Sequence, residues 1–183
     1  MPATFDWEAD TGAATGSPAK GTTRTTGITD NNWKNIDDST TAYSAAPITA
    51  GNNSYERWTF GKFSGTFNQI LSGLWAHTAT AFGTGLTLKG VPATSSDGTR
   101  PLYTTPSTSA NSTFTVDMTS AISISSGVAI FFGATGPEAT GKASSTTSNP
   151  SYTNYLGSQL QTTSSAAPGD TAQVTLTLQY QEN

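Results

Sequence analysis

Val174-Thr-Leu-Thr-Leu-Gln-Tyr180 decides the fold of this chain, because apolar and polar residues alternate along it without a break. Successive side chains of a β-strand point to opposite faces of a sheet, so this pattern predicts a strand with one buried face. Residues 113–118 and 86–88 alternate in the same way. The run 128–132 is apolar throughout, which predicts a central strand covered on both faces.

The rest of residues 52–183 shows the same pattern of short strands separated by turns. Residues 55–63 and 67–77 predict two more strands, and segments rich in Gly, Pro, Ser and Asn separate the strands. No long segment keeps helical spacing between two capping residues. About six to eight short strands at near-regular spacing predict an all-β fold, and we expect an antiparallel, jelly-roll-like β-sandwich over residues 52–183.

The first 51 residues differ from this body, and we expect an extended, mostly irregular N-terminal arm over residues 1–51. Residues 10–30 contain one large aliphatic residue and show no period, so they cannot bury enough apolar surface to fold alone. Apolar side chains flank this tether on both sides: Phe5, Trp7, Trp33 and Ile36. The arm either docks these side chains on a neighbouring subunit, which is the interpretation we test, or folds over its own domain.

Composition excludes several classes of function. About three residues in ten are Ser or Thr, only 11% are charged, and the chain has no Cys and one His. An ordinary domain has roughly 25% charged residues, and catalysis draws mainly on His, Cys, Asp, Glu and Lys. We therefore expect a protein that is not an enzyme, holds no cofactor and works through its surface.

Charge and hydropathy exclude further partners. The net charge is −4 and the eight basic residues are scattered, whereas phosphate binding needs clustered Lys and Arg. No run approaches the ~20 apolar residues of a membrane helix. The first residues lack the basic and apolar regions of a signal peptide. We expect no nucleic acid, no membrane and synthesis in a cytosol.

A few polar residues are candidates for catalysis or metal binding. His77 is the only histidine, and no orienting acid or nucleophile can be assigned to it from the sequence, so we expect a structural or surface role. Asp37-Asp38 offers carboxylates for calcium but lacks the spaced acidic loop of an EF-hand, and it also suits the start of a turn. Glu56 and Glu138 do not define a glycosidase pair without their separation in space. We expect no metal site.

Aromatic residues near predicted loops raise a different possibility. Tyr103, Tyr152 and Tyr155, set among polar residues, are candidates for a sugar-stacking platform that contacts a host glycan. The competing interpretation is that these rings pack a core short of aliphatic residues or fill an oligomer interface, where aromatic residues are enriched.

Two stretches carry a resemblance to a known class of protein. Residues 43–70, with Tyr55-Glu-Arg-Trp-Thr-Phe-Gly-Lys-Phe63 at their centre, resemble structural proteins of tailed bacteriophages. The C-terminal residues 170–183, which end in Leu-Thr-Leu-Gln-Tyr-Gln-Glu-Asn183, add to this resemblance. The similarity is confined to these two stretches and contains no catalytic signature.

This resemblance implies a virion component of the capsid decoration or cement type, made in the host cytoplasm. Its expected partners are the major capsid protein and copies of itself, as a homo-trimer. The alternative is a carbohydrate-binding or adhesion module of a phage fibre or surface protein.

Overall fold

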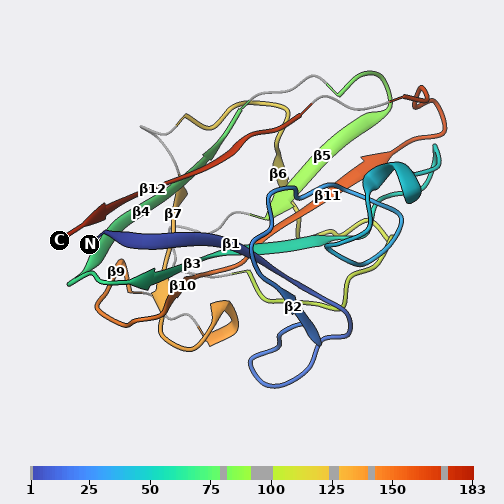
Figure 1. Ribbon diagram of the computed structural model, residues 1–183. Coiled ribbons are helices and arrows are strands. Elements are labelled where there is room, and N and C mark those ends of the chain that lie inside the picture. The colour runs from blue at the N-terminus through green and yellow to red at the C-terminus, as the bar shows by residue number, and fades with distance from the viewer. Residues whose placement is uncertain (1, 79–81, 92–100, 124–127, 140–142, 170–172) are drawn as a thin grey trace.

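The computed structural model describes residues 2–78, 82–91, 101–123, 128–139, 143–169 and 173–183. The described chain is nearly all β, and antiparallel sheets pack against each other (Figure 1). The strands of the larger sheet are β1 (Ala3–Thr11), β2 (Thr23–Thr25), β3 (Arg57–Gly65), β5 (Leu86–Val91), β6 (Val116–Asp117), β8 (Phe132–Gly133), β10 (Ser151–Thr153) and β11 (Leu156–Thr162).

The smaller sheet contains β4 at its centre, with β12 on one side of it. Its strands are β4 (Ile70–His77), β7 (Val128–Ala129), β9 (Ser145–Thr146) and β12 (Leu176–Glu182). Within the described residues, the 3-10 turns η1 (Tyr43–Ala45) and η3 (Pro137–Ala139) interrupt the connections. The chain crosses repeatedly from one sheet to the other, as from β3 to β4 and from β11 to β12, and this confirms the predicted antiparallel β-sandwich.

Strand β3 is the centre of the larger sheet. On one side it pairs with β1 from Ala3 opposite Gly65 to Asp10 opposite Trp58. On the other side it pairs with β10 and β11. Strand β11 continues the sheet to β5, with Leu160 opposite Leu88. The predicted alternation at 86–88 lies in β5, and that at 174–180 lies in β12 from Leu176 onward.

The main hydrophobic core lies between the two sheets. Its buried members come from both layers: Phe63, Ile70, Trp75, Phe82, Leu88, Met118, Ile130, Phe132, Leu156 and Leu160. The Phe63 ring packs edge-on against Tyr180 of β12, with 4.7 Å between centroids. At Gly61 a Cβ atom would come within 2.5 Å of the Phe5 ring, so this glycine lets the aromatic side chain lie against the sheet.

A second cluster covers the opposite face of the larger sheet. Side chains alternate along a strand, so Trp58 and Phe60 point away from the face that carries Phe63. They pack with Tyr103, Phe114 and Tyr155, and these five side chains form the buried second cluster. Both faces of β3 are therefore covered, which explains why its burial does not alternate.

Two predicted strands are shorter than their patterns suggested. The apolar run 128–132 was predicted as one central strand, but β7 joins the smaller sheet and β8 joins the larger one. Between them the backbone N–H of Phe131 bonds the Asn154 side chain at 2.9 Å, and the chain changes sheets there. Of the alternating residues 113–118, only Val116–Asp117 pair as β6.

The predicted arm needs a larger correction. Residues 3–11 form β1, which is paired with β3 along nearly its whole length and belongs to the sandwich. Residues 12–56 contain only β2 and η1 as regular elements, and they run over the surface of the same domain. The boundary that the sequence suggested after residue 51 therefore does not separate two independent parts of this structure.

Phe5 provides a test of how firmly β1 belongs to the core. Its ring contacts Trp7, Phe63 and Tyr180, with centroids 5.1, 5.2 and 6.5 Å away. We expect Phe5→Ala to lower the free energy of unfolding by roughly 2–4 kcal/mol, less than the roughly 3–5 kcal/mol typical of a fully buried Phe on average, because this ring is only half-buried. Urea titration, monitored by tryptophan fluorescence, measures this loss of stability.

The matched control for this change is Tyr43→Ala. Tyr43 is 48% exposed, so its removal should change stability by less than about 0.5 kcal/mol. Equal stabilities of the two variants would contradict the placement of β1 in the core.

Candidate functional site

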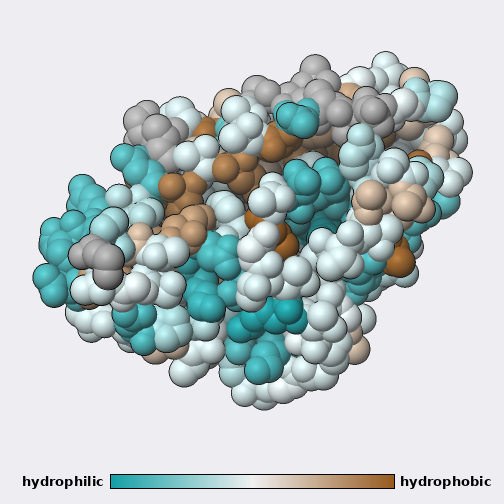
Figure 2. Space-filling model, in the orientation of Figure 1, coloured by the Kyte–Doolittle hydropathy of each residue, from teal (hydrophilic) through white to brown (hydrophobic). Residues whose placement is uncertain are grey.

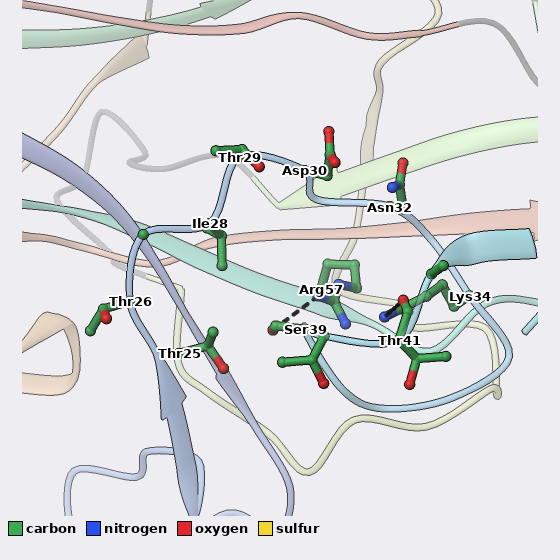
Figure 3. Close-up of a pocket in the computed structure, with 13 residues that line it drawn as sticks. Thr25, Thr26, Ile28, Thr29, Asp30, Asn32, Lys34, Ser39, Thr41 and Arg57 are labelled. Carbon is green, nitrogen blue, oxygen red and sulfur yellow. Dashed lines mark hydrogen bonds between the residues drawn. The ribbon is translucent and has the colours of Figure 1, made fainter. Parts of the chain in front are cut away.

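Two buried cations form the floor of a pocket at the edge of the sandwich. Arg57 begins β3, Lys34 lies in the preceding loop, and each is only 2% exposed. The Arg57 guanidinium donates to Ser39 Oγ at 3.1 Å, to Asn31 Oδ1 at 3.4 Å and to the carbonyl oxygen of Asp38. Figure 3 shows Arg57 and Lys34 between the two loop segments that make the walls.

Asp38 holds this loop in shape. Its Oδ1 accepts from Lys34 Nζ at 2.6 Å and from the backbone N–H groups of Thr40 and Thr41 at 3.2 and 2.9 Å. Burial alone would raise the pKa of Asp38, but the hydrogen bonds from Lys34 and Thr41 outweigh it and hold the pKa well below its usual range. The turn that Asp38 was expected to begin is therefore present, and its carboxylate also neutralises Lys34.

The pocket itself has a volume of about 430 Å³. One wall is the segment 25–32 and the other is the segment 39–42 (Figure 3). Six lining residues carry hydroxyl groups: Thr25, Thr26, Thr29, Ser39, Thr40 and Thr41. Asp30 and Asn32 add a carboxylate and an amide, and Ile28 and Ala42 are the apolar members of the lining.

The charges around the floor nearly balance. Burial lowers the pKa of Arg57, and the nearby carboxylates of Asp37 and Asp38 act against this. Burial raises the pKa of Asp37, although its carboxylate accepts the backbone N–H of Gly12 at 2.7 Å. Two cations thus face two adjacent carboxylates, so the pocket offers hydrogen-bonding groups without a strong net charge.

A second polar cluster lies on the face of the larger sheet. Arg24 of β2 donates to both carboxylate oxygens of Asp10, at 2.8 and 2.9 Å, and to Glu138 at 3.3 Å. Burial opposes the charge of Arg24, but the hydrogen bonds to Asp10 outweigh this and raise its pKa. The Tyr155 hydroxyl also donates to Asp10. These contacts tie β1, β2 and η3 together.

The three candidate glycan tyrosines do not form a platform. Tyr103 and Tyr155 are buried in the second core cluster, and the Tyr103 hydroxyl donates to the carbonyl oxygen of Gly12 at 2.6 Å. Burial raises the pKa of both hydroxyls. Tyr152 is half-buried, with the Lys62 Nζ atom 6.0 Å from its ring centroid. The structure therefore corrects the assignment of Tyr103 and Tyr155 as glycan contacts in favour of the packing interpretation.

The four arm residues also separate into two groups. Phe5, Trp7 and Trp33 pack against the main core of their own chain, and Trp33 Nε1 donates to Ser158 Oγ at 3.1 Å. Ile36 alone is exposed, at 41%. Phe5, Trp7 and Trp33 are therefore engaged by their own domain, which favours the alternative in which the N-terminal segment folds over that domain.

His77, Glu56 and Glu138 make contacts within the fold. His77 is buried beside Trp75, and its Nδ1 atom lies 3.1 Å from the carbonyl oxygen of Thr78. Glu56 bonds the Asn111 amide at 2.8 Å, whereas Glu138 bonds Arg24. Burial raises the pKa of Glu56. Among the residues that the structure describes, no group of three His, Cys, Asp or Glu side chains is placed to hold a metal ion.

No motif in the sequence predicts the pocket. The loop residues 25–42 and Arg57 of β3 are separated in the sequence, and only the fold brings them together. The weak signal was the density of Thr in 22–29, which has no strand or helix period. A hydroxyl-rich segment that makes a wall accounts for that composition.

Comparison of the chain with protein-family models, with curated proteins and with solved structures found no significant match. Within the described residues, no helix has the length and hydropathy needed to cross a membrane.

The Lys34–Asp38 pair makes stability depend on pH. We expect Asp38→Asn to lower the free energy of unfolding at pH 7 by at least ~2 kcal/mol, because it leaves a buried ammonium without its carboxylate. A depressed folded-state pKa stabilises the protein above the unfolded value of about 3.9. This contribution is lost as pH falls below that value, so the difference between variant and wild type should shrink in acid.

Denaturant titrations at several pH values between 3 and 7 measure this effect. Asp117→Asn is the matched control, because the Lys89–Asp117 pair at 3.3 Å is exposed and should contribute less than about 1 kcal/mol. A deficit for Asp38→Asn that is as small as the control, or that grows in acid, would contradict the role assigned to Asp38.

Proposed function

We propose that this chain is a virion structural protein that decorates or cements the capsid lattice of a tailed bacteriophage through contacts between subunits. The sequence resemblance at 43–70 and 170–183 supports this function, and these stretches include β3 and β12. The observation that carries the proposal is the edge of β12 with which no described strand pairs. Its proposed partners are the major capsid protein and other copies of the chain, as a homo-trimer.

Strand β12 pairs with β4 on one side and with no described strand on the other. The carbonyl of Thr175 and the N–H of Asn183 bond residues at the two ends of β4, so the odd-numbered backbone groups face β4. The even-numbered groups, at Leu176, Leu178, Tyr180 and Glu182, face the outer edge. An unpaired edge of this length is a template on which another chain can add a strand.

The side chains of β12 extend this surface. Leu176, Leu178 and Tyr180 pack on the main core but remain only half-buried. Figure 2 shows apolar surface along the line that β12 follows in Figure 1. A partner strand at this edge would cover both the free backbone groups and part of this apolar area, and apolar burial is the main favourable contribution to association.

Exposed apolar side chains elsewhere also suit an interface. Among the described residues the large exposed ones are Ile36, Tyr43 and Leu102, at 41%, 48% and 61%. Asn35, beside Ile36, donates its backbone N–H to Ala46 at 3.1 Å, which places the Ile36 and Tyr43 segments together. Exposed apolar groups that cluster mark interaction surfaces more often than isolated ones do.

Binding to particles tests this proposal. Particles that lack the chain are incubated with the purified protein, and quantitative mass spectrometry counts the bound copies. We expect saturable binding of wild type, and at least a ~10-fold loss of occupancy for the double variant Thr177→Lys, Gln179→Lys. Both side chains are exposed, and lysines on an edge strand oppose the addition of another strand.

Thr4→Lys is the matched control, because Thr4 is exposed on β1, which is already paired with β3. It should bind as wild type does, and circular dichroism checks that every variant is folded. Absence of the chain from native particles would overturn the proposed function. Full occupancy by the β12 double variant would overturn the assignment of the interface to β12.

A further inference from the structure

We propose that the pocket between the segments 25–32 and 39–42 binds a neutral saccharide. This inference does not depend on the function in a virion, because it follows from the lining of the pocket in a single chain. It also moves the glycan hypothesis away from Tyr103 and Tyr155, whose rings are buried.

The size and polarity of the pocket select the ligand class. Its volume of about 430 Å³ lies within the range of small-molecule sites. Most such sites are lined mainly by apolar and aromatic side chains, whereas hydroxyl groups dominate this lining. Thr41 Oγ1 already donates to Asp38, and Ser39 Oγ accepts from Arg57. An apolar ligand would remove water from the other four hydroxyls without replacing its hydrogen bonds, at a cost in free energy. A polyhydroxylated ligand can both donate to and accept from Ser and Thr hydroxyls.

The charge balance argues for a neutral ligand over an anionic one. The ammonium of Lys34 already bonds Asp38 at 2.6 Å and the Thr41 carbonyl oxygen at 2.7 Å. Arg57 lies near Asp37 and Asp38, and Asp30 adds a further carboxylate to the lining. A phosphate or carboxylate ligand would therefore meet acidic groups as well as cations. A sugar hydroxyl can accept from the cations and donate to Asp30.

The floor of the pocket is organised before any ligand arrives. The bonds to Asn31, Asp38 and Ser39 use one N–H on each guanidinium nitrogen of Arg57. A guanidinium has five N–H groups, so each terminal nitrogen retains a second one. Figure 3 places Arg57 below Thr29, Asp30 and Asn32, with Ser39 and Thr41 on the other side. A fixed donor at the base with hydroxyls on both walls suits a compact ring that bears several hydroxyls.

Nuclear magnetic resonance titration of the whole chain tests this site directly. The probes are methyl glycosides of glucose, galactose, mannose and N-acetylglucosamine, with inorganic phosphate as the anionic comparison. We expect at least one glycoside to shift the backbone amide signals of residues 25–34 and 39–42 saturably, with a Kd in the millimolar range. Asn32→Ala and Thr40→Val should each weaken this binding at least ~10-fold.

Asn52→Ala serves as the matched control, because Asn52 is exposed outside the pocket, and it should bind as wild type does. The corresponding reducing sugars distinguish a free sugar from the end of a glycan chain, since only the latter is mimicked by a methyl glycoside. Absence of saturable shifts with every sugar, stronger binding of phosphate, or unchanged binding in both pocket variants would overturn the proposal.

Discussion

The pairing of β1 with β3 is the constraint on which the rest of the structure depends. Residues of β3 face two separate apolar clusters, so any segment that pairs with it must also present an inner and an outer face. Strand β1 does this with Phe5 and Trp7 towards the main core and with Asp10 towards the second cluster. Through this single pairing the N-terminal residues become part of both cores.

The few charged residues of the chain are placed where they hold segments against β1 and β3. Among the described residues, five charged side chains are almost completely buried: Glu8, Asp10, Lys34, Glu56 and Arg57. Each has a partner of opposite charge or a hydrogen-bond partner, such as Lys62 for Glu8 and Asn111 for Glu56. Burial of an unpaired charge is costly, so these contacts determine how the irregular segments cover β1 and β3. The pocket is one result, because Arg57 and Asp38 fix its floor.

The β-sandwich could be predicted from the sequence because its signal is local. Alternation at 86–88 and 174–180 depends only on neighbouring residues, and both stretches form strands. The run 128–132 was misassigned because an apolar run is the same whether it stays in one sheet or crosses between two. Residues 3–11 were misassigned because pairing with β3 needs a partner more than 45 positions away, which no local pattern reports.

The candidate site was even harder to predict from local sequence patterns than the strands were. Tyr103 and Tyr155 are flanked by turn residues, and this sequence context resembles that of binding residues in loops. The structure places them against Trp58, because the outer face of β3 needs an apolar cover. The pocket depends on loop geometry that Asp38 creates through hydrogen bonds with Lys34 and Thr41. Residue types alone specify the chemistry of such a loop but not the position of its walls.

Native-state hydrogen exchange tests most directly whether β1 is part of the folding unit. Amides in peptides that cover residues 3–11 and 57–65 are compared by mass spectrometry under conditions in which exchange reports the free energy of opening. If β1 is a core strand, its paired amides exchange only by global unfolding, with the same free energy as those of β3. Opening of residues 3–11 at a free energy several kcal/mol lower, while β3 stays protected, would show a detachable arm and contradict this account.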